Sequence, residues 1–388
     1  MTRVLIISAK RTPISPKHGA LKAAPFFDLA ACAIKALLPA CPNLEAYGVR
    51  QPLTSQTKAL QALIAGNALG AGGNPARLMA LAAGLPAGLP AMTIDTQCCS
   101  GLDAIGLAFE RLMASPLNQP RLILAGGAES ASLSPIRIDR LTQQAYEEAP
   151  FTPWPDRNPS MLDAAIDLER SRGLSHKDML DWLDNSLQRV RQPSRSITPC
   201  LGVEEDRQPP TLSPALIRRA AGRRPYNPLL MAPLADGAAF VALSTQAHSI
   251  PLDDGEPFCL PLEVLSFGQA GSDPALPGLS CQALAAWLGE CEQRFEFDRK
   301  KMVVSLMESF VAQVLANVQD LGLDPQRVNP WGGLLTRGHP VGASGAVLVC
   351  DLFDHLGPGE IGLALIPAAG GLASGLLVRR LNAKTSGF

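Results

Sequence analysis

The chain has 388 residues, of which 47% are hydrophobic and 18% are charged, and its formal net charge at pH 7 is −1. A chain of this length can bury a large core, and its balanced charge gives no bulk attraction to nucleic acid or to a membrane surface. The composition therefore disfavours those two partners and agrees with a cytoplasmic enzyme made of two domain-sized halves.

Nine cysteines are scattered along the chain without any paired Cys-x-x-Cys spacing. This pattern predicts neither a zinc site nor a framework of disulfides. The run from Met1 to Ile7 is short and rich in β-formers, and it lacks the long apolar stretch of a signal peptide. No run of about 18 apolar residues indicates a transmembrane helix. We therefore expect a soluble protein in the reducing environment of the cytoplasm.

The first part of the chain alternates apolar strands with helices rich in small residues, which is typical of an α/β layered fold. A strand-like run from Leu89 to Ile94 leads to the string Gln97-Cys98-Cys99-Ser100-Gly101, and an apolar helical stretch follows to Met113. At such a junction, backbone N–H groups and the helix dipole favour a thiolate. Cys98 is therefore a candidate nucleophile, and a buried structural cysteine is the alternative.

From about residue 132 to 234 the composition changes, with more charge, proline and tryptophan, which indicates an inserted segment. Ser175 is a candidate N-cap for a helix that includes Met179 to Val190. Guanidinium groups suit phosphate oxygens or an acidic protein surface, although a solvated basic face is an equally open interpretation. The candidate binding arginines of this segment are Arg218, Arg219, Arg223 and Arg224.

The chain contains an internal repeat. The pair Ser100-Gly101 is followed by a helix, an apolar strand and a glycine turn, and so is the pair Ser344-Gly345. Ser100 and Ala125 are 25 positions apart, as are Ser344 and Ala369. A single long-range recurrence predicts two copies of one α/β unit rather than a solenoid. Because Cys98 and His339 both lie just before these serines, pseudo-twofold packing would bring them together.

Five motifs, in order and at compatible spacings, resemble those of the thiolase superfamily along essentially the whole chain. They are Ala9–Pro13, Gln97–Gly101, Gly126–Ser130, Asp236–Ala239, and Asn329–Gly333 followed by Gly338–Pro340. The resemblance implies two duplicated α/β halves in a layered α-β-α-β-α core. The N-terminal half would span 1–247, with an inserted loop domain at about 132–234, and the C-terminal half would span 248–388.

The resemblance also implies the roles of the candidate residues. Cys98 would accept an acyl group from a thioester, and His339 would activate the thiol, since imidazole exchanges protons near neutral pH. The backbone N–H groups of Cys98 and Ala369 would hold the oxyanion. The substrate would be a thioester of coenzyme A or of the phosphopantetheine of an acyl carrier protein, with no bound cofactor. A homodimer or homotetramer is expected.

Two positions depart from the family pattern. Met307 stands where the family's Asn-Glu-Ala-Phe string has asparagine, and a thioether cannot order the water that the asparagine fixes. Pro367 stands where the family has its second catalytic cysteine, and proline has no proton to exchange. The usual base for an α-proton is therefore missing. Cys99 and Cys350 are interpreted as a filler residue and a core residue rather than as substitute bases.

These departures favour acyl transfer through an S-acyl Cys98, or a condensation in which loss of carbon dioxide from a malonyl unit creates the carbanion, in a biosynthetic setting. Arg337 is a candidate for holding a malonyl carboxylate, with an exposed loop arginine as the alternative. Two other functions stay open. One is an ordinary 3-ketoacyl-CoA thiolase with a substituted base, and the other is an inactive partner subunit that binds acyl thioesters. The presence of both Cys98 and His339 argues against the inactive protein.

Overall fold

The computed structural model describes residues 3–38, 60–114, 121–146, 148–190, 194–207, 227–245 and 260–382. Its main sheet has 10 strands in the order β10-β11-β12-β9-β1-β8-β5-β3-β4, with β2 paired to β8, and β6 and β7 form a separate hairpin. The strands are β1 (Leu5–Arg11), β2 (Ser15–Pro16), β3 (Leu60–Gly66), β4 (Ala91–Ile94), β5 (Leu122–Ser130), β6 (Arg137–Ile138), β7 (Ala145–Tyr146), β8 (Ala235–Ser244), β9 (Leu262–Gly271), β10 (Val303–Leu306), β11 (Ile361–Ala368) and β12 (Leu372–Arg380). The helices are α1 (Phe26–Leu37), α2 (Pro75–Ala82), α3 (Ser100–Met113), α4 (Met161–Arg172), α5 (His176–Arg189), α7 (Ala285–Phe295), α8 (Val311–Asp320), α9 (Leu334–Arg337) and α10 (Ser344–His355).

The sheet repeats one strand order. In the first series β3 runs parallel to β5, and β5 and β1 pair antiparallel with β8. In the second series β10 runs parallel to β11, and β11 and β9 pair antiparallel with β12. The two series meet where Leu5 and Ile6 of β1 pair with Glu263 and Leu262 of β9. The predicted repeat is thus confirmed as two α/β halves of similar topology.

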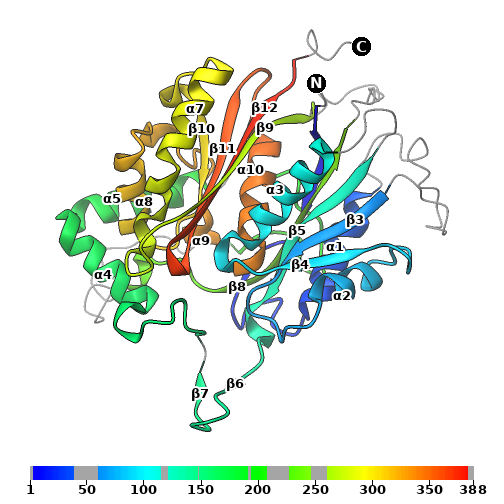
Figure 1. Ribbon diagram of the computed structural model, residues 1–388, viewed down its shortest axis with the longest axis horizontal. Helices are drawn as coiled ribbons and strands as arrows, with labels where there is room; N and C mark the ends of the chain where they lie inside the picture. The colour runs from blue at the N-terminus through cyan, green and yellow to red at the C-terminus, as the bar shows by residue number, and fades with distance from the viewer. Residues whose placement is uncertain are drawn as a thin grey trace.

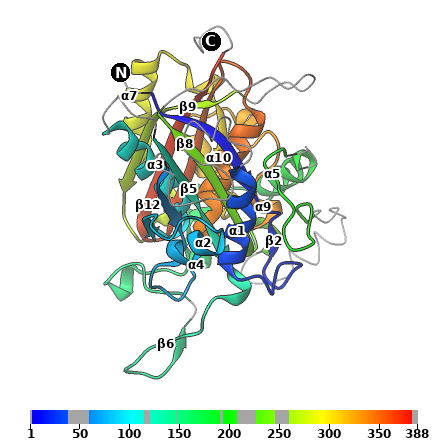
Figure 2. The same cartoon turned by 90° about the vertical axis from the view of Figure 1, so that its right-hand side faces the viewer.

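Helices α3 and α10 form the middle layer between these halves (Figure 1). Each of them contacts strands of both halves, and α10 is buried from Ser344 to Phe353. A helix that is apolar on nearly all sides is stable only in such an enclosed position. Helices α1 and α2 cover the outer face of the N-terminal half, whereas α7, α8 and the 3-10 helix Pro277–Leu284 lie over the C-terminal half (Figures 1 and 2). The layers follow the expected α-β-α-β-α order.

Most predicted elements are present with shifted ends. The strand expected from Leu89 begins at Ala91, and the helix after Cys98 ends at Met113 as predicted. The hydroxyl of Ser175 accepts the N–H of Asp178 at 3.1 Å, so this serine does cap α5. Helices α4 and α5 come from the segment interpreted as an insertion, and they pack against α8 and α9 (Figure 1). The domain boundaries 1–247, 132–234 and 248–388 stay predictions.

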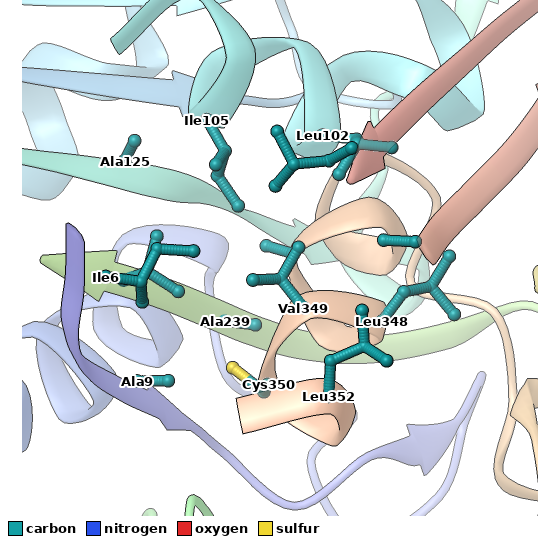
Figure 3. Close-up of a cluster of buried hydrophobic side chains, with 14 of the residues drawn as sticks. Ile6, Ala9, Leu102, Ile105, Ala125, Ala239, Leu348, Val349, Cys350 and Leu352 are labelled. Atoms are coloured by element: carbon teal, nitrogen blue, oxygen red, sulfur yellow. The ribbon is translucent and has the colours of Figure 1, made fainter. Parts of the chain in front are cut away.

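The core between the halves is built from side chains of the two middle helices and the strands beside them (Figure 3). Leu102 and Ile105 of α3 lie near Val349 of α10, and all three have 0% exposure. Burying an aliphatic side chain of this size stabilises the fold by about 1.5–3 kcal/mol. Cys350 lies in the same cluster, as predicted for a core cysteine. This packing fixes α3 against α10.

Glycines allow the starts of these two helices to meet backbone to backbone. A Cβ atom on Gly127 would lie 2.1 Å from the carbonyl oxygen of Gly342, and one on Gly101 would lie 2.8 Å from it. A Cβ on Gly345 would lie 2.5 Å from the backbone nitrogen of Leu102. Neighbouring backbone atoms cannot move aside as a flexible side chain can. Only glycine therefore fits at these three positions.

The cysteine spacing indicated no framework of disulfides, but one disulfide is present among the described residues. Cys32 of α1 is bonded to Cys200, 168 residues away, with their Cα atoms 5.7 Å apart. Sequence spacing could not indicate this pair, because only the folded chain brings the two residues together. The bond attaches segment 194–207 to the N-terminal half. The same segment is also held by Asp206, which accepts two hydrogen bonds of 2.8 Å from the buried guanidinium of Arg11.

The contact at Gly342 leads to a first prediction. Gly127→Ala is expected to lower the free energy of unfolding by about 3 kcal/mol, at the upper end of the cost of overpacking, because the new methyl group must displace a backbone carbonyl. Gly88→Ala is the matched control, since no atom lies within 4 Å of a Cβ built there. Chemical denaturation of both variants measures the difference. Equal stability of the two variants would contradict the close contact.

Candidate active site

The two halves each contribute one side chain to a thiol–imidazole pair. Cys98 lies in the 3-10 turn Gln97–Cys99 that precedes α3, and His339 lies just before the turn Val341–Ala343 that precedes α10. The Sγ atom of Cys98 is 3.2 Å from Nε2 of His339. The pairing predicted from the repeat is therefore present, and it arises because both residues come just before a middle-layer helix.

The turn that carries Cys98 has an unfavourable backbone conformation, which hydrogen bonds stabilise. Gln97 has φ 56°, in the left-handed region that non-glycine residues rarely adopt. Ser100 donates its hydroxyl proton to the carbonyl of Gln97 at 2.5 Å and accepts the N–H of Thr96 at 3.0 Å. The carboxylate of Asp95 accepts the N–H of Gln97 at 3.1 Å. These bonds hold the turn, so the position of the thiol is fixed before any substrate binds.

His339 is fixed through both its ring and its backbone. The hydroxyl of Ser344 lies 2.6 Å from Nδ1, which leaves Nε2 facing Cys98. The backbone N–H donates to the carbonyl of Pro233 at 2.7 Å, and the carbonyl accepts from Ala235 at 3.1 Å. Sequence reasoning used Ser344 only as a marker of the repeat. Its place five residues after the histidine, at a helix start, was the available signal for this role.

Glu129 is a second residue whose role the sequence analysis missed. Its carboxylate is buried, and it accepts N–H groups from Ala68 at 2.9 Å and from Gly342 at 3.0 Å, and the side-chain amide of Asn67 at 2.9 Å. Burial nonetheless raises the pKa of Glu129 to about 7. The carboxylate connects the end of β5 to the loop that follows His339. The motif Gly126–Ser130 contained this residue, but its spacing gave no sign of the partner loop.

Burial determines the charge state of the pair. Desolvation raises the pKa of the Cys98 thiol to about 12, against the smaller opposite effect of the backbone N–H groups of Ala369 and Cys98. Desolvation lowers the pKa of His339 to about 4. Both side chains are therefore neutral near pH 7. The N–H donors at the helix start lower the pKa of the thiol, as the sequence suggested, but removal from water has the larger effect and raises it.

A small cavity of about 40 Å³ opens beside the thiol. Apolar groups make up most of its wall, and of the described residues around it only Cys98 has an ionisable side chain. The residues that line it are Cys98, Met161, Ala164, Ala165, Leu168, Pro277, Gly278, Ser309, Phe310, Gln313, Pro367, Ala368 and Ala369. The space suits a small apolar group attached to the sulfur.

Pro367 and Met307, the two residues that depart from the family pattern, lie at different distances from the cavity. Pro367 of β11 lines the cavity and offers no exchangeable proton there. Met307 has 0% exposure and packs into the core between the halves, so its side chain is not part of the described cavity wall. The sequence predicted that the usual second acid or base would be missing, and this holds for the described part of the site. That part contains a nucleophile and an imidazole but no second acid or base.

Both interpretations of Arg337 were wrong. Its side chain is 6% exposed and forms an ion pair with Asp351, with nitrogen–oxygen distances of 2.9 and 2.5 Å. Asp351 lies on the buried helix α10, so the guanidinium is its counter-charge rather than a free group for a malonyl carboxylate. The other predicted binding arginines, Arg218, Arg219, Arg223 and Arg224, lie outside the described residues.

Two other kinds of feature are absent from the described ranges. No cluster of three or more His, Cys, Asp or Glu side chains there could hold a metal ion. None of the helices described is both long and apolar enough to cross a bilayer.

Comparison with known proteins gives the family. The thiolase N-terminal domain matches residues 4–150, and the thiolase C-terminal domain matches residues 263–380. The chain belongs to the thiolase family. The second match begins at β9, the first strand of the second series, whereas β8 of the first series lies between the two matched ranges. The family match confirms the acyltransferase class expected from the sequence.

Individual relatives cover nearly the whole thiolase chain. Proteins named "Probable acetyl-CoA acyltransferase" from Staphylococcus aureus strains MSSA476 and MRSA252 are each 28% identical to it over 417 residues, which include 98% of this chain and 100% of theirs. The crystal structure of the Acat5 thiolase from Ascaris suum in complex with coenzyme A has a TM-score of 0.81 and 24% identity, covering 98% of this chain and 100% of that one. The structural likeness confirms the fold.

The charge state of the pair leads to a prediction about pH. Because iodoacetamide reacts with thiolate, the rate of Cys98 alkylation is expected to rise about tenfold per pH unit between about pH 6 and about pH 9, below the raised pKa. Peptide mass spectrometry measures the rate at Cys98, with Cys98→Ala as the control. A thiolate paired with imidazolium would instead give a plateau across this range, which would contradict a neutral pair.

Proposed function

We propose that this thiolase-family chain moves acyl groups between thioesters through an S-acyl Cys98, without abstracting an α-proton. One observation carries the proposal. Cys98 and His339 lie 3.2 Å apart, beside an apolar cavity whose described wall has no further ionisable side chain. A thiol and an imidazole are sufficient for acyl transfer, whereas chemistry at the α-carbon needs an additional acid or base.

In the first step the sulfur of Cys98 attacks the thioester carbonyl while its proton passes to Nε2 of His339. The sulfur–carbon bond to the enzyme forms and the bond to the leaving thiol breaks, and His339 returns the proton to that thiol. Ser344 holds Nδ1, so Nε2 stays directed at the sulfur. The backbone N–H groups of Cys98 and Ala369 lie beside the sulfur, which supports the proposal that they stabilise the oxyanion.

In the second step an acceptor thiol gives its proton to His339 and attacks the acyl carbonyl. The bond between the acyl carbon and the sulfur of Cys98 breaks, and His339 returns the proton to that sulfur. No α-proton moves in either step. A Claisen condensation or its reversal would need a proton acceptor or donor at the α-carbon, where Pro367 has none. A decarboxylative condensation avoids that need but requires a group to hold the malonyl carboxylate. Arg337, the predicted candidate, is already paired with Asp351. Acyl transfer is therefore the favoured reaction.

Coenzyme A thioesters are the proposed substrates. The Staphylococcus aureus relatives carry the name acetyl-CoA acyltransferase, and the Ascaris suum thiolase was crystallised with coenzyme A. The small apolar cavity suits a short acyl chain. The carrier-protein thioester, the biosynthetic setting, the homodimer or homotetramer and the cytoplasmic location stay predictions from the sequence.

The proposal is tested by intact-protein mass spectrometry after incubation with acetyl-CoA. The wild type and the Cys99→Ala variant are expected to gain the mass of one acetyl group, and Cys98→Ala is expected to gain none. Addition of a small acceptor thiol should remove the adduct and release the acetylated acceptor. The Cys99→Ala variant is the matched control because this neighbouring thiol is fully buried.

Two results would contradict the proposal. Absence of an adduct with acetyl-, longer acyl- and malonyl-thioesters would favour a partner subunit that only binds thioesters. Thiolysis of a 3-oxoacyl-CoA at a rate similar to that of acyl transfer would indicate an ordinary thiolase with a base elsewhere.

A further inference from the structure

Ser309 contributes a rigidly held position to the wall of the Cys98 cavity. Its backbone N–H donates to the side-chain oxygen of Gln313 at 3.1 Å, and its carbonyl accepts the N–H of Ala232 at 3.0 Å. The backbone on both sides of the side chain is therefore already engaged. A group carried by such a backbone is positioned before the substrate arrives, which is what preorganised catalysis requires.

The hydroxyl of Ser309 is available for a ligand. It makes no hydrogen bond within the described part of the chain, whereas the amide of Gln313 is engaged at both ends, since its nitrogen donates to the carbonyl of Met307 at 3.1 Å. Of the described cavity residues with polar side chains, Cys98 is the nucleophile and Gln313 is already bonded. Ser309 thus carries the remaining side-chain donor in a wall that is otherwise apolar.

The reaction creates a need for such a donor. Negative charge develops on the carbonyl oxygen when Cys98 is acylated and again when the acceptor attacks. In a small apolar cavity that charge is poorly solvated, so each added donor has a large effect. Met307 cannot help, because its thioether lies in the core. In the segment 307–310 the polar group that is available to the site is therefore the hydroxyl of Ser309, two residues after Met307.

We propose that Ser309 is a catalytic residue whose O–H donates a hydrogen bond to the carbonyl oxygen of the acyl group under attack. The inference rests on the proposed acyl transfer through Cys98. Ser309 keeps its proton throughout, while the thiol proton passes through His339 to the leaving thiol. Bond formation at Cys98 and bond cleavage to the leaving thiol are unchanged. The hydroxyl acts only by stabilising the charge that appears on oxygen.

Ser309→Ala tests this role. Acetylation of Cys98 by acetyl-CoA and removal of the acetyl group by an acceptor thiol are timed separately by mass spectrometry. At least one of the two rates is expected to fall by about 100-fold, the size seen when one oxyanion donor is lost. Alkylation of Cys98 by iodoacetamide, which forms no oxyanion, is expected to keep the wild-type rate.

Ser186→Ala is the matched control. The hydroxyl of this serine of α5 is buried and, like that of Ser309, makes no hydrogen bond among the described residues, but Ser186 lines a different cavity, near Glu308. Its acyl-transfer rates should match those of the wild type. Unchanged acyl transfer in Ser309→Ala would overturn the inference. An equal fall in acyl transfer and alkylation would also overturn it, because the serine would then have a structural role. If wild-type Cys98 is never acylated, the proposed function fails first, so the two failures are distinguishable.

Discussion

The contact of backbone with backbone at Gly342 is the constraint on which the site depends. The carbonyl of Gly342 lies among three glycines, Gly66, Gly101 and Gly127, where any Cβ atom would come within 2.8 Å of it. This contact allows the starts of α3 and α10 to meet at the centre of the molecule. Since Cys98 precedes one helix and His339 precedes the other, the same contact sets the distance between sulfur and imidazole. The carboxylate of Glu129 strengthens it through the N–H of Gly342.

The enclosed position has an electrostatic consequence. Exclusion of water favours the neutral forms of the half-buried Cys98 and the buried His339 at rest, raising the pKa of the thiol to about 12 and lowering that of the imidazole to about 4. Charge then appears only when the sulfur attacks a thioester, where fixed N–H groups are available to stabilise it. The same exclusion requires any buried charge to be paired, and Arg337 with Asp351 shows how the fold meets that requirement. Apolar surroundings thus favour a reaction that begins and ends with neutral groups.

The sequence was sufficient to predict the architecture and the central pair. The equal spacing after Ser100 and Ser344 predicted two similar halves, and the meeting of Cys98 with His339 followed from that symmetry. Local patterns with fixed periods or offsets, such as the cap at Ser175, were also predictable. These features depend on neighbours along the chain or on the repeat itself.

Features that depend on the surroundings in space were not predictable. The spacing of the cysteines contained no sign of the bond between Cys32 and Cys200. Arg337 was interpreted as free because its partner Asp351 lies on another helix, the buried α10, and the sequence does not show that the two side chains meet. The raised pKa of Cys98 depends on how much water the fold removes, and the local helix start indicated the opposite direction. The predictions that failed were therefore those that depended on burial or on contacts between residues far apart in the sequence.

Hydrogen exchange at the α-carbon is the direct test of acyl transfer without α-proton abstraction. The protein is incubated in deuterium oxide with acetyl-CoA and an acceptor thiol. Mass spectrometry then measures the deuterium content of the acetyl groups on Cys98, on the acceptor and in the recovered acetyl-CoA. Acetyl groups are expected to be transferred without gaining deuterium, because Pro367 cannot act as the base at that carbon. Deuterium uptake that keeps pace with transfer and disappears in Cys98→Ala would contradict the account, since it would require a base that acts on the bound acyl group.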